Sequence, residues 1–275
     1  MHLRARDLFM SKVSINILTK NRAQALKKAL ESLLSQTFHN YELVIVNDGS
    51  TDNTEDILNN FKFSASAKAT ADRQIANFQI IHHPSSIGIT ASRQEALAAS
   101  NGEYVAILDD DDVWSDKHKL NKQVEFLNSH RDVVLVGGGI TISNFPPPPR
   151  QGRTGKLEIS KSRPQSDIQI RQTMLFRNNF FTSSVMFRRE AAIKAGGFVK
   201  DGADLAEDYD LWLRMGQLGK MYNFQEAFVN YRVPSYNKEK FKEFLQKQLR
   251  LIQREKGNYP GFLPASLILK IRLLF

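Results

Sequence analysis

The stretch that decides the fold of this chain is NGEYVAILDDDDVW, residues 101–114. Its centre, Tyr104–Leu108, is a short apolar run and is typical of a buried strand. Four consecutive aspartates, Asp109 to Asp112, follow that strand directly. Carboxylates packed so closely repel one another, and a divalent cation removes that repulsion. Hard oxygen ligands without His or Cys favour Mg²⁺ or Mn²⁺. A solvated acidic turn that caps a helix near Ser115 is the alternative, but the position after a buried strand favours the metal.

Upstream of this stretch, short apolar runs alternate with segments of helical periodicity. We expect strands at Val13–Leu18, Tyr41–Val46, Phe78–Ile81 and Tyr104–Leu108, with a helix at Ala91–Ala99. Asn21 can cap a helix that follows the first strand, and Asp52 with Glu55 resembles the capping box of a helix that follows the second strand. This alternation predicts an α/β fold with a mostly parallel central sheet and helices on both faces. Ligands bind at the carboxyl ends of the strands in such sheets, where the acidic turns lie.

The rest of the chain departs from this alternation in several places. Ser64–Ala76 is rich in Ala, Ser and Lys and is expected to be an exposed insertion. Pro146–Pro149 and the polar stretch to about Ser166 are expected to form a loop. Order is expected again at Phe181–Phe187, in a helix beginning near Glu207, and in a last amphipathic helix with Phe241, Phe244, Leu245, Leu249 and Ile252.

Four further residues carry side chains suited to chemistry. Asp48 ends the second strand, and its carboxylate would accept a hydrogen bond from a base or ribose, or Asn47-Asp48-Gly49 simply forms a turn. Arg93 would pair with a phosphate, or with the aspartates as a structural ion pair. Glu207 and Asp208 head a helix, where a carboxylate would act as a general base or only complement the helix dipole.

Composition narrows the function classes. The chain has 275 residues, a net charge of +9 and no cysteine, which excludes disulfides, thiolate metal sites and cysteine nucleophiles. The basic residues are scattered without an Arg-rich arm, so no nucleic-acid partner is expected. The chain also lacks a GxxxxGK[ST] loop and a GxGxxG turn after a strand, which weakens ATPase and dinucleotide-binding interpretations.

The location is predicted from the two ends of the chain. Met1–Lys12 lacks the apolar centre of a secretory signal, and no apolar run reaches the ~20 residues that span a bilayer. We therefore expect a cytoplasmic protein. The C-terminal residues 267–275 interleave apolar side chains with Lys270 and Arg272. They would either rest on the inner face of the cell membrane or form a closing helix that packs on the domain.

Taken together, these segments resemble the family 2 glycosyltransferases, which have a GT-A fold. The resemblance spans about residues 12–232 in order and at family-like spacing. The matching segments are Val13–Arg22, Gln36–Phe38, Glu42–Asp52, Gly88–Asp112, Asn101–Trp114, Met186–Glu190, Gly196–Phe198 and Glu207–Arg214. Each segment is weak evidence, whereas the ordered set is highly specific.

The resemblance implies a role for each candidate residue. Asp48 would contact the base of the nucleotide, which is uracil in the implied donor, and Thr19 and Asn21 would line the nucleotide pocket with Arg93. Asp109 and Asp111 occupy the Asp-x-Asp positions of the metal site, with Asp111 as the direct ligand and Asp110 near the ribose or metal. Asp208 matches the general base, with Glu207 beside it. These positions imply inverting transfer from a nucleotide sugar with Mn²⁺ or Mg²⁺.

The resemblance also implies a division of the chain. Residues 1–11 would be an extension, 12–135 the nucleotide-sugar half, 136–232 the acceptor half, and 233–275 a helical tail. Two residues depart from the family pattern: Lys20 stands where the family often has an aromatic residue that would stack on the base, and Gln94 replaces an asparagine that is common after the arginine. The acceptor would be a glycan or glycolipid of surface polysaccharide synthesis. The alternatives are a sugar nucleotidyltransferase, disfavoured because Leu18–Arg22 contains no glycine, and a non-catalytic glycan- or nucleotide-binding module.

Overall fold

A computed structural model describes residues 12–67, 77–145, 157–199, 205–232 and 238–274. The strands are β1 (Val13–Thr19), β2 (Tyr41–Asn47), β3 (Asn77–His82), β4 (Tyr104–Ile107), β5 (Val113–Trp114), β6 (Val133–Phe145), β7 (Leu157–Lys161), β8 (Met186–Arg188) and β9 (Lys220–Tyr231). The helices are α1 (Ala23–Leu34), α2 (Thr54–Ala67), α3 (Ile89–Ala99), α4 (Lys119–Ser129), α5 (Asp167–Thr173), η2 (Thr182–Ser184), α6 (Arg189–Lys194), α7 (Glu207–Met215), α8 (Lys238–Arg254) and α9 (Phe262–Leu274).

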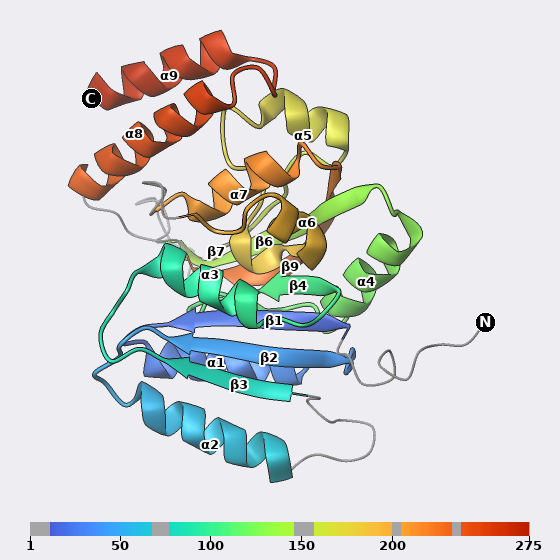
Figure 1. Ribbon diagram of the computed structural model, residues 1–275, viewed down its shortest axis with the longest axis vertical. Coiled ribbons are helices and arrows are strands. Elements are labelled where there is room, and N and C mark those ends of the chain that lie inside the picture. Colours follow the sequence, from blue (N-terminus) through green and yellow to red (C-terminus); the bar gives the residue numbers. More distant parts are fainter. Residues whose placement is uncertain (1–11, 68–76, 146–156, 200–204, 233–237, 275) are drawn as a thin grey trace.

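All described strands belong to one sheet with the order β3-β2-β1-β4-β8-β6-β9-β5, and β7 pairs with β6 (Figure 1). The first four strands are parallel, as predicted, with Val13 of β1 opposite Tyr41 of β2 and Tyr104 of β4. Beyond β4 the sheet is mixed, because β8 is antiparallel to both β4 and β6 while β6 and β9 are parallel. The predicted α/β fold is confirmed, with a mixed rather than uniformly parallel sheet.

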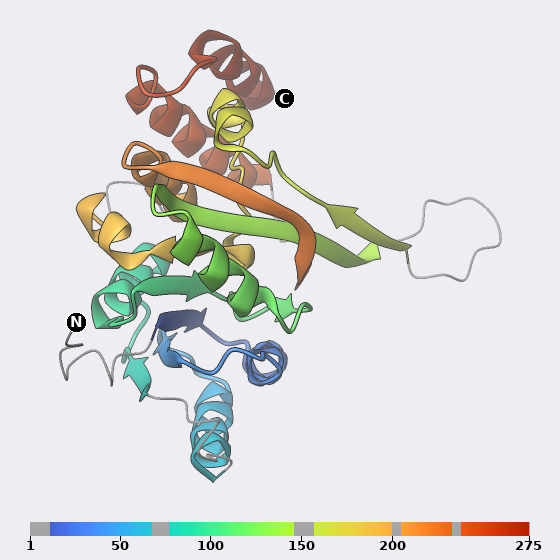
Figure 2. The same ribbon diagram turned by 90° about the vertical axis from the view of Figure 1, so that its right-hand side faces the viewer.

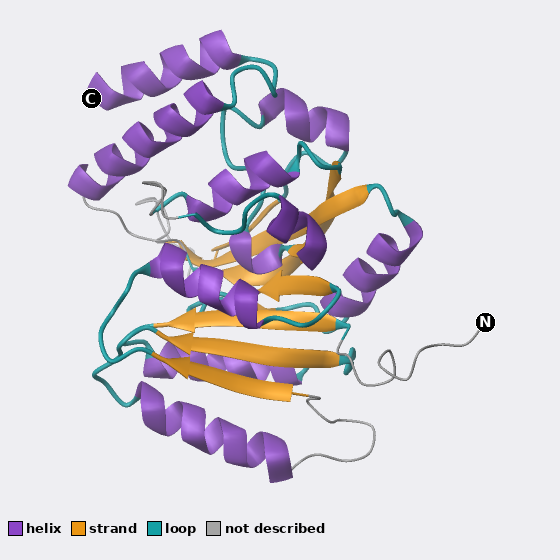
Figure 3. Cartoon of the chain, viewed as in Figure 1, coloured by secondary structure: helices purple, strands orange, loops and turns teal. Residues whose placement is uncertain are grey.

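Helices cover both faces of the parallel part, as the alternation predicted (Figures 1 and 3). Leu26, Leu30 and Leu33 of α1 pack in one buried cluster with Ile15 of β1. On the opposite face, Ala96 of α3 packs against Val44 and Val46 of β2. Every residue of β2 is buried, as expected for a central strand covered on both sides.

A second core lies under the helices of the C-terminal half. Its largest fully buried side chain is Trp212 of α7, whose ring contacts the rings of Phe180 and Phe187. The last helices join this core through Leu245 of α8 and Leu269 of α9. The predicted boundary at residue 135 remains a prediction, and β6 runs across it.

The predicted helix caps are wrong in detail. Asn21 has a left-handed backbone (φ 53°) and does not cap α1. Asp52 instead accepts a hydrogen bond from the amide of Ala23, at the start of α1, at 3.2 Å. Its other carboxylate oxygen accepts from the amide and hydroxyl of Thr54, so it does not form a box with Glu55. One aspartate therefore ties the starts of α1 and α2 together, a long-range contact that local spacing does not reveal.

Two segments predicted as irregular contain regular structure. Helix α2 continues to Ala67, so the predicted insertion Ser64–Ala76 begins inside a helix, and residues 68–76 lie outside the described part of the chain. The predicted loop contains β7, which pairs with Ile140–Phe145 of β6 at the edge of the sheet. Figure 2 shows β6 and β7 extending together from the body. Pro146–Pro149 lie outside the described residues.

The predicted last amphipathic helix is α8, and a further helix, α9, follows it. Asp210 of α7 anchors α8, because its buried carboxylate accepts hydrogen bonds from Arg254 of α8 and Arg214, both at 2.5 Å. In the described part of the chain, no helix is long and apolar enough to cross a membrane.

Candidate active site

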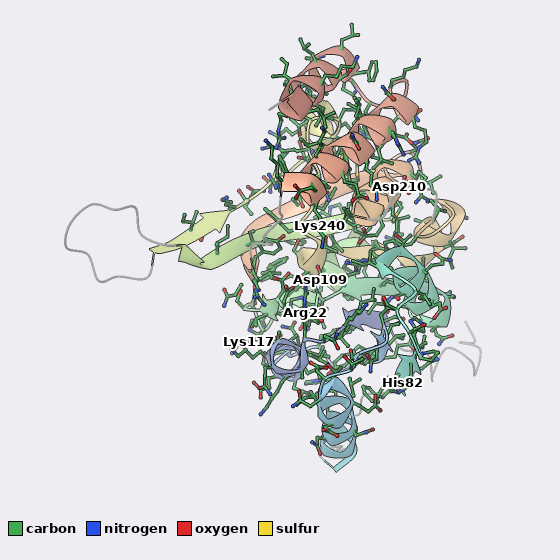
Figure 4. All side chains as sticks on the ribbon, turned by 90° about the vertical axis from the view of Figure 1, so that its left-hand side faces the viewer. Arg22, His82, Asp109, Lys117, Asp210 and Lys240 are labelled. Carbon is green, nitrogen blue, oxygen red and sulfur yellow. The ribbon has the colours of Figure 1, made fainter. Side chains whose placement is uncertain are left out.

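The predicted site residues come from separate segments of the chain. Thr19 and Asp48 lie at or just after the carboxyl ends of β1 and β2, and Asp109 lies just after β4. Figure 4, which faces the ends toward which these parallel strands run, labels Asp109 and Arg22 on this side of the molecule, and Arg22 pairs with Asp110 and Asp111, the next residues of the run. Asp208 lies in the first turn of α7.

A buried ion-pair network joins the aspartate run to α7. The guanidinium of Arg93 donates to Asp109 at 2.9 Å and to Glu207 at 3.0 Å. Burial acts to lower the pKa of Arg93, but the carboxylates of Asp109 and Glu207 outweigh it and raise that pKa. Burial raises the pKa of Glu207, and Arg93 opposes this rise. The structural ion pair, one of the two alternatives for Arg93, is therefore present, and it holds the two halves of the site together.

Arg22 neutralises the middle of the aspartate run. Its guanidinium lies 2.8 Å from a carboxylate oxygen of Asp110 and 3.0 Å from one of Asp111. Burial raises the pKa of Asp110 to about 6 even though Arg22 lowers it. Burial also raises the pKa of Asp111, with the charge of Asp109 adding to the rise. The sequence analysis quoted Arg22 at the end of a family segment but gave it no role.

Asp112 has a structural position within the run. Its carboxylate accepts a hydrogen bond from the hydroxyl of Ser183 at 2.5 Å and from the amide of Arg232 at 2.9 Å. The amide of Asp109 donates to the same Ser183 hydroxyl at 3.0 Å. Burial raises the pKa of Asp112, and Asp109 adds to the rise. The run therefore divides into one structural carboxylate and three near the site, a distinction that four identical residues in sequence do not reveal.

The carboxylate of Asp48 is engaged in the turn that precedes α3. It accepts hydrogen bonds from the hydroxyl of Ser86 at 2.6 Å, the amide of Ile87 at 2.8 Å and a ring nitrogen of His83 at 2.9 Å. Burial acts to raise its pKa, but these hydrogen bonds outweigh it and lower the pKa to about 2. The next residue, Gly49, has φ 70°, and a Cβ there would lie 2.7 Å from the amide nitrogen of Ser86. Asp48 thus orders this turn, and its contact with a base remains a prediction.

The carboxylate of Asp208 has a fixed orientation at the start of α7. One oxygen accepts hydrogen bonds from the side chains of Asn178 at 3.1 Å and Thr182 at 2.6 Å. The other accepts from the amide of Tyr209 at 2.6 Å. Asp208 is only partly buried, whereas Glu207 beside it is buried and paired with Arg93. Of the two acids, Asp208 is therefore the more exposed.

Two predicted pocket residues lie near the end of β1. Thr19 is buried, and the hydrogen bond of its side chain to Asp110 acts to lower the pKa of that carboxyl. Asn21 is exposed and accepts from the amide of Thr51 at 2.7 Å, which links the ends of β1 and β2.

The donor set suits a cation that is shared with a substrate. Within the described ranges, no three His, Asp or Glu side chains form a group that could hold a metal alone. Mg²⁺ commonly binds through one or two carboxylates, waters and substrate phosphates. Asp109 and Asp111 are 29% and 21% exposed and supply such oxygens. Their mutual repulsion, which contributes to the raised pKa of Asp111, is the charge a cation would offset.

The family model of Glycosyl transferase family 2 matches residues 14–196. The chain is 32% identical over 227 residues to the protein EpsE of Bacillus subtilis, covering 82% of this chain and 74% of that protein. It is 27% identical over 271 residues to the amylovoran biosynthesis glycosyltransferase AmsE of Erwinia amylovora, covering 96% and 93%. The chain is therefore a glycosyltransferase and belongs to family 2.

Solved structures share the fold at low sequence identity. TarS residues 1–349 from S. aureus superposes with a TM-score of 0.65 at 18% identity, covering 93% of this chain and 70% of that one. The mannosyltransferase PcManGT of Pyrobaculum calidifontis, solved with GDP-Man and Mn²⁺, gives 0.64 at 18% identity, covering 96% and 70%. These similarities confirm the predicted GT-A fold.

Proposed function

We propose that this glycosyltransferase moves a sugar from a nucleoside diphosphate sugar, with UDP as the first candidate, to a hydroxyl of a glycan or glycolipid, and that the configuration of the sugar inverts. The observation that supports this proposal most strongly is the contact of Arg93 with both Asp109 and Glu207. This ion pair fixes the metal and donor end of the site beside the first turn of α7, where Asp208 lies.

In this proposal, Asp208 acts as the general base. Its hydrogen bonds with Asn178, Thr182 and the amide of Tyr209 hold the carboxylate in one orientation. The carboxylate takes the proton of the acceptor hydroxyl as the oxygen forms a bond to the anomeric carbon. The bond from that carbon to the diphosphate oxygen breaks, and the nucleoside diphosphate leaves with the electron pair. One displacement of this kind inverts the anomeric configuration.

At the donor end, we propose that Asp109 and Asp111 hold Mn²⁺ or Mg²⁺, with Asp111 as the direct ligand. When bound, such a cation offsets the negative charge that develops on the leaving diphosphate. Arg22 contacts one carboxylate oxygen of Asp111; if its guanidinium moved to a phosphate oxygen of the donor, both oxygens of Asp111 would be open to the cation. Thr19, Asn21, Asp48 and Asp110 would complete the nucleotide pocket.

The donor base and the acceptor are proposed on weaker grounds. UDP and UDP-GlcNAc are bound in two TarS structures, whereas PcManGT was solved with GDP-Man. The printed name of AmsE places that relative in amylovoran biosynthesis, which supports a role in surface polysaccharide synthesis for this chain.

A thermal-shift panel tests the donor site. The purified chain is heated with UDP-, GDP- and dTDP-sugars, each with Mn²⁺, Mg²⁺ or EDTA. Because a ligand that binds only the folded state raises its stability, one nucleotide should raise the melting temperature when metal is present. The Asp111→Ala variant should lose that shift, and the control Asp132→Ala, which replaces a surface aspartate paired with Lys220, should keep it. A shift that EDTA leaves unchanged contradicts the proposed metal site. No shift with any pair contradicts the proposed donor site and favours the alternative of a glycan-binding module.

A further inference from the structure

The C-terminal helix α9 has two different sides. Ala265, Ser266 and Leu269 are buried against the rest of the protein. On the other side, Leu263, Leu267, Ile268 and Ile271 are 77%, 59%, 47% and 46% exposed. A closing helix that only packs on its domain would present polar residues to water on this side. The helix therefore carries a second apolar surface that the fold does not cover.

This surface is held on a rigid support. The Arg272 guanidinium lies over the ring of Phe241, 5.4 Å from its centroid, which joins the end of α9 to the start of α8. Helix α8 is in turn fixed to α7 by the ion pair of Arg254 with buried Asp210. The exposed apolar residues of α9 thus have a defined arrangement before any partner arrives.

Positive charge borders the apolar stripe. With 3.6 residues per turn, Lys270 falls on one side of Leu267 and Ile271, and Arg272 falls on the other. Both basic side chains are exposed, and α9 contains no acidic residue. An apolar stripe between cationic side chains is the arrangement of a helix that lies in the headgroup region of a membrane.

We propose that this α9 face, made of Leu263, Leu267, Ile268, Lys270, Ile271 and Arg272, docks on the surface of an anionic lipid bilayer. The apolar stripe would enter the boundary between headgroups and acyl chains, and the two cations would contact lipid phosphates. The charge pattern disfavours a second copy as the occupant, because two α9 faces in contact would bring like charges together without an acid on either helix. The inference extends the proposed function, but its test requires neither donor nor acceptor.

Vesicle flotation tests the docking surface directly. The full chain, without nucleotide or metal, is mixed with vesicles of phosphatidylcholine alone or of phosphatidylcholine with phosphatidylglycerol. We expect the wild type to float with the anionic vesicles and to bind neutral vesicles much more weakly. The double variant Leu267→Gln/Ile271→Gln should bind anionic vesicles about tenfold or more weakly, because exposed apolar area is lost.

Matched variants separate this surface from general effects. The control Ile168→Gln/Leu218→Gln changes two residues that are 70% and 48% exposed on other elements, and it should bind like the wild type. Lys270→Gln should weaken binding to anionic vesicles about fivefold, and added salt should remove the difference. Arg272→Gln, which also loses the contact with Phe241, should weaken binding at least as much. If the Leu267→Gln/Ile271→Gln variant melts at a lower temperature than its control, its loss of binding could reflect loss of folding, and the charge variants then decide the test.

Three results would overturn the proposal. The first is a wild type that floats with neither kind of vesicle. The second is a set of α9 variants that bind as the control does. The third is a wild type that light scattering shows to be a dimer without lipid, and that Leu267→Gln/Ile271→Gln converts to a monomer, since the α9 face would then contact a second copy. Each result leaves the donor-binding panel unaffected.

Discussion

Replacing Asp210 with asparagine should destabilise the protein strongly, because two arginines depend on its carboxylate. Asp210 is fully buried and accepts hydrogen bonds from Arg214 of α7 and Arg254 of α8. Removing one partner of a buried ion pair costs about 3–5 kcal/mol, since the remaining charge stays in a poorly solvated place. The side chain of Arg254 is 42% exposed and can turn toward water, whereas that of Arg214 is 16% exposed. We therefore expect the lower end of the range, about 3 kcal/mol.

Urea unfolding measures this cost, with Arg254→Gln as the matched control. Its partly exposed guanidinium should contribute only about 1 kcal/mol, as exposed ion pairs do. In the Asp210→Asn/Arg254→Gln double variant, Arg254 no longer adds an unpaired charge, so the two single effects should not add. An Asp210→Asn cost below about 1 kcal/mol, or single effects that simply add in the double variant, would refute the claim that this carboxylate joins α8 to α7.

Three further outcomes follow from the same structure. Gly49→Ala should destabilise by about 1–3 kcal/mol in urea unfolding, because its φ is 70° and the added Cβ meets backbone, whereas Gly257→Ala, with open space around it, should be close to neutral. Asp48 has a pKa lowered from 3.8 to about 2, so its carboxylate should contribute about 2 kcal/mol to the free energy of unfolding above pH 4, and this contribution should be lost as the pH falls toward 2. Asp48→Asn should flatten that part of the curve of stability against pH, and an unchanged curve would contradict this expectation. Arg93→Met should cost about 3 kcal/mol by leaving buried Glu207 unpaired, and Arg93→Met/Glu207→Gln should recover part of it; if the double variant is no more stable, the pair does not join the two halves.

Local patterns were sufficient for the first half of the fold. The strands at Val13–Leu18 and Tyr41–Val46 were predicted within one residue of their ends, because short, largely apolar and β-branched runs are typical of parallel strands buried on both faces. The later strands were harder to predict. Strand β7 follows a polar stretch and is stabilised by pairing with β6 at an edge, which periodicity alone does not indicate. The cap of α1 was missed for a similar reason, since Asp52 reaches Ala23 from another turn.

The sequence predicted which residues carry the chemistry of the site, but it did not predict which of their side chains contact one another. The sequence identified Asp109 and Asp208 as candidate site residues, but it left open whether Arg93 pairs with a phosphate or with carboxylates. The guanidinium of Arg93 lies between Asp109 and Glu207, and Glu207 is 114 residues further along the sequence. Arg22 and Ser183 were not identified because their roles come only from tertiary proximity to the aspartate run. An arginine just after β1, within the quoted family segment, was the available signal for Arg22.

Transfer by the purified Asp208→Asn variant is the measurement that tests the central claim most directly. With the donor selected by the binding panel and an acceptor found by screening lipid-linked and free sugars, the wild type and Asp208→Asn are compared with the control Asp132→Asn. The substitution preserves the shape of a side chain held by Asn178 and Thr182, so the donor should bind with an unchanged dissociation constant. Transfer should fall by a factor of about 10² to 10⁴, as expected for loss of a general base. Transfer at the wild-type rate by Asp208→Asn would contradict the assignment of Asp208 as the base.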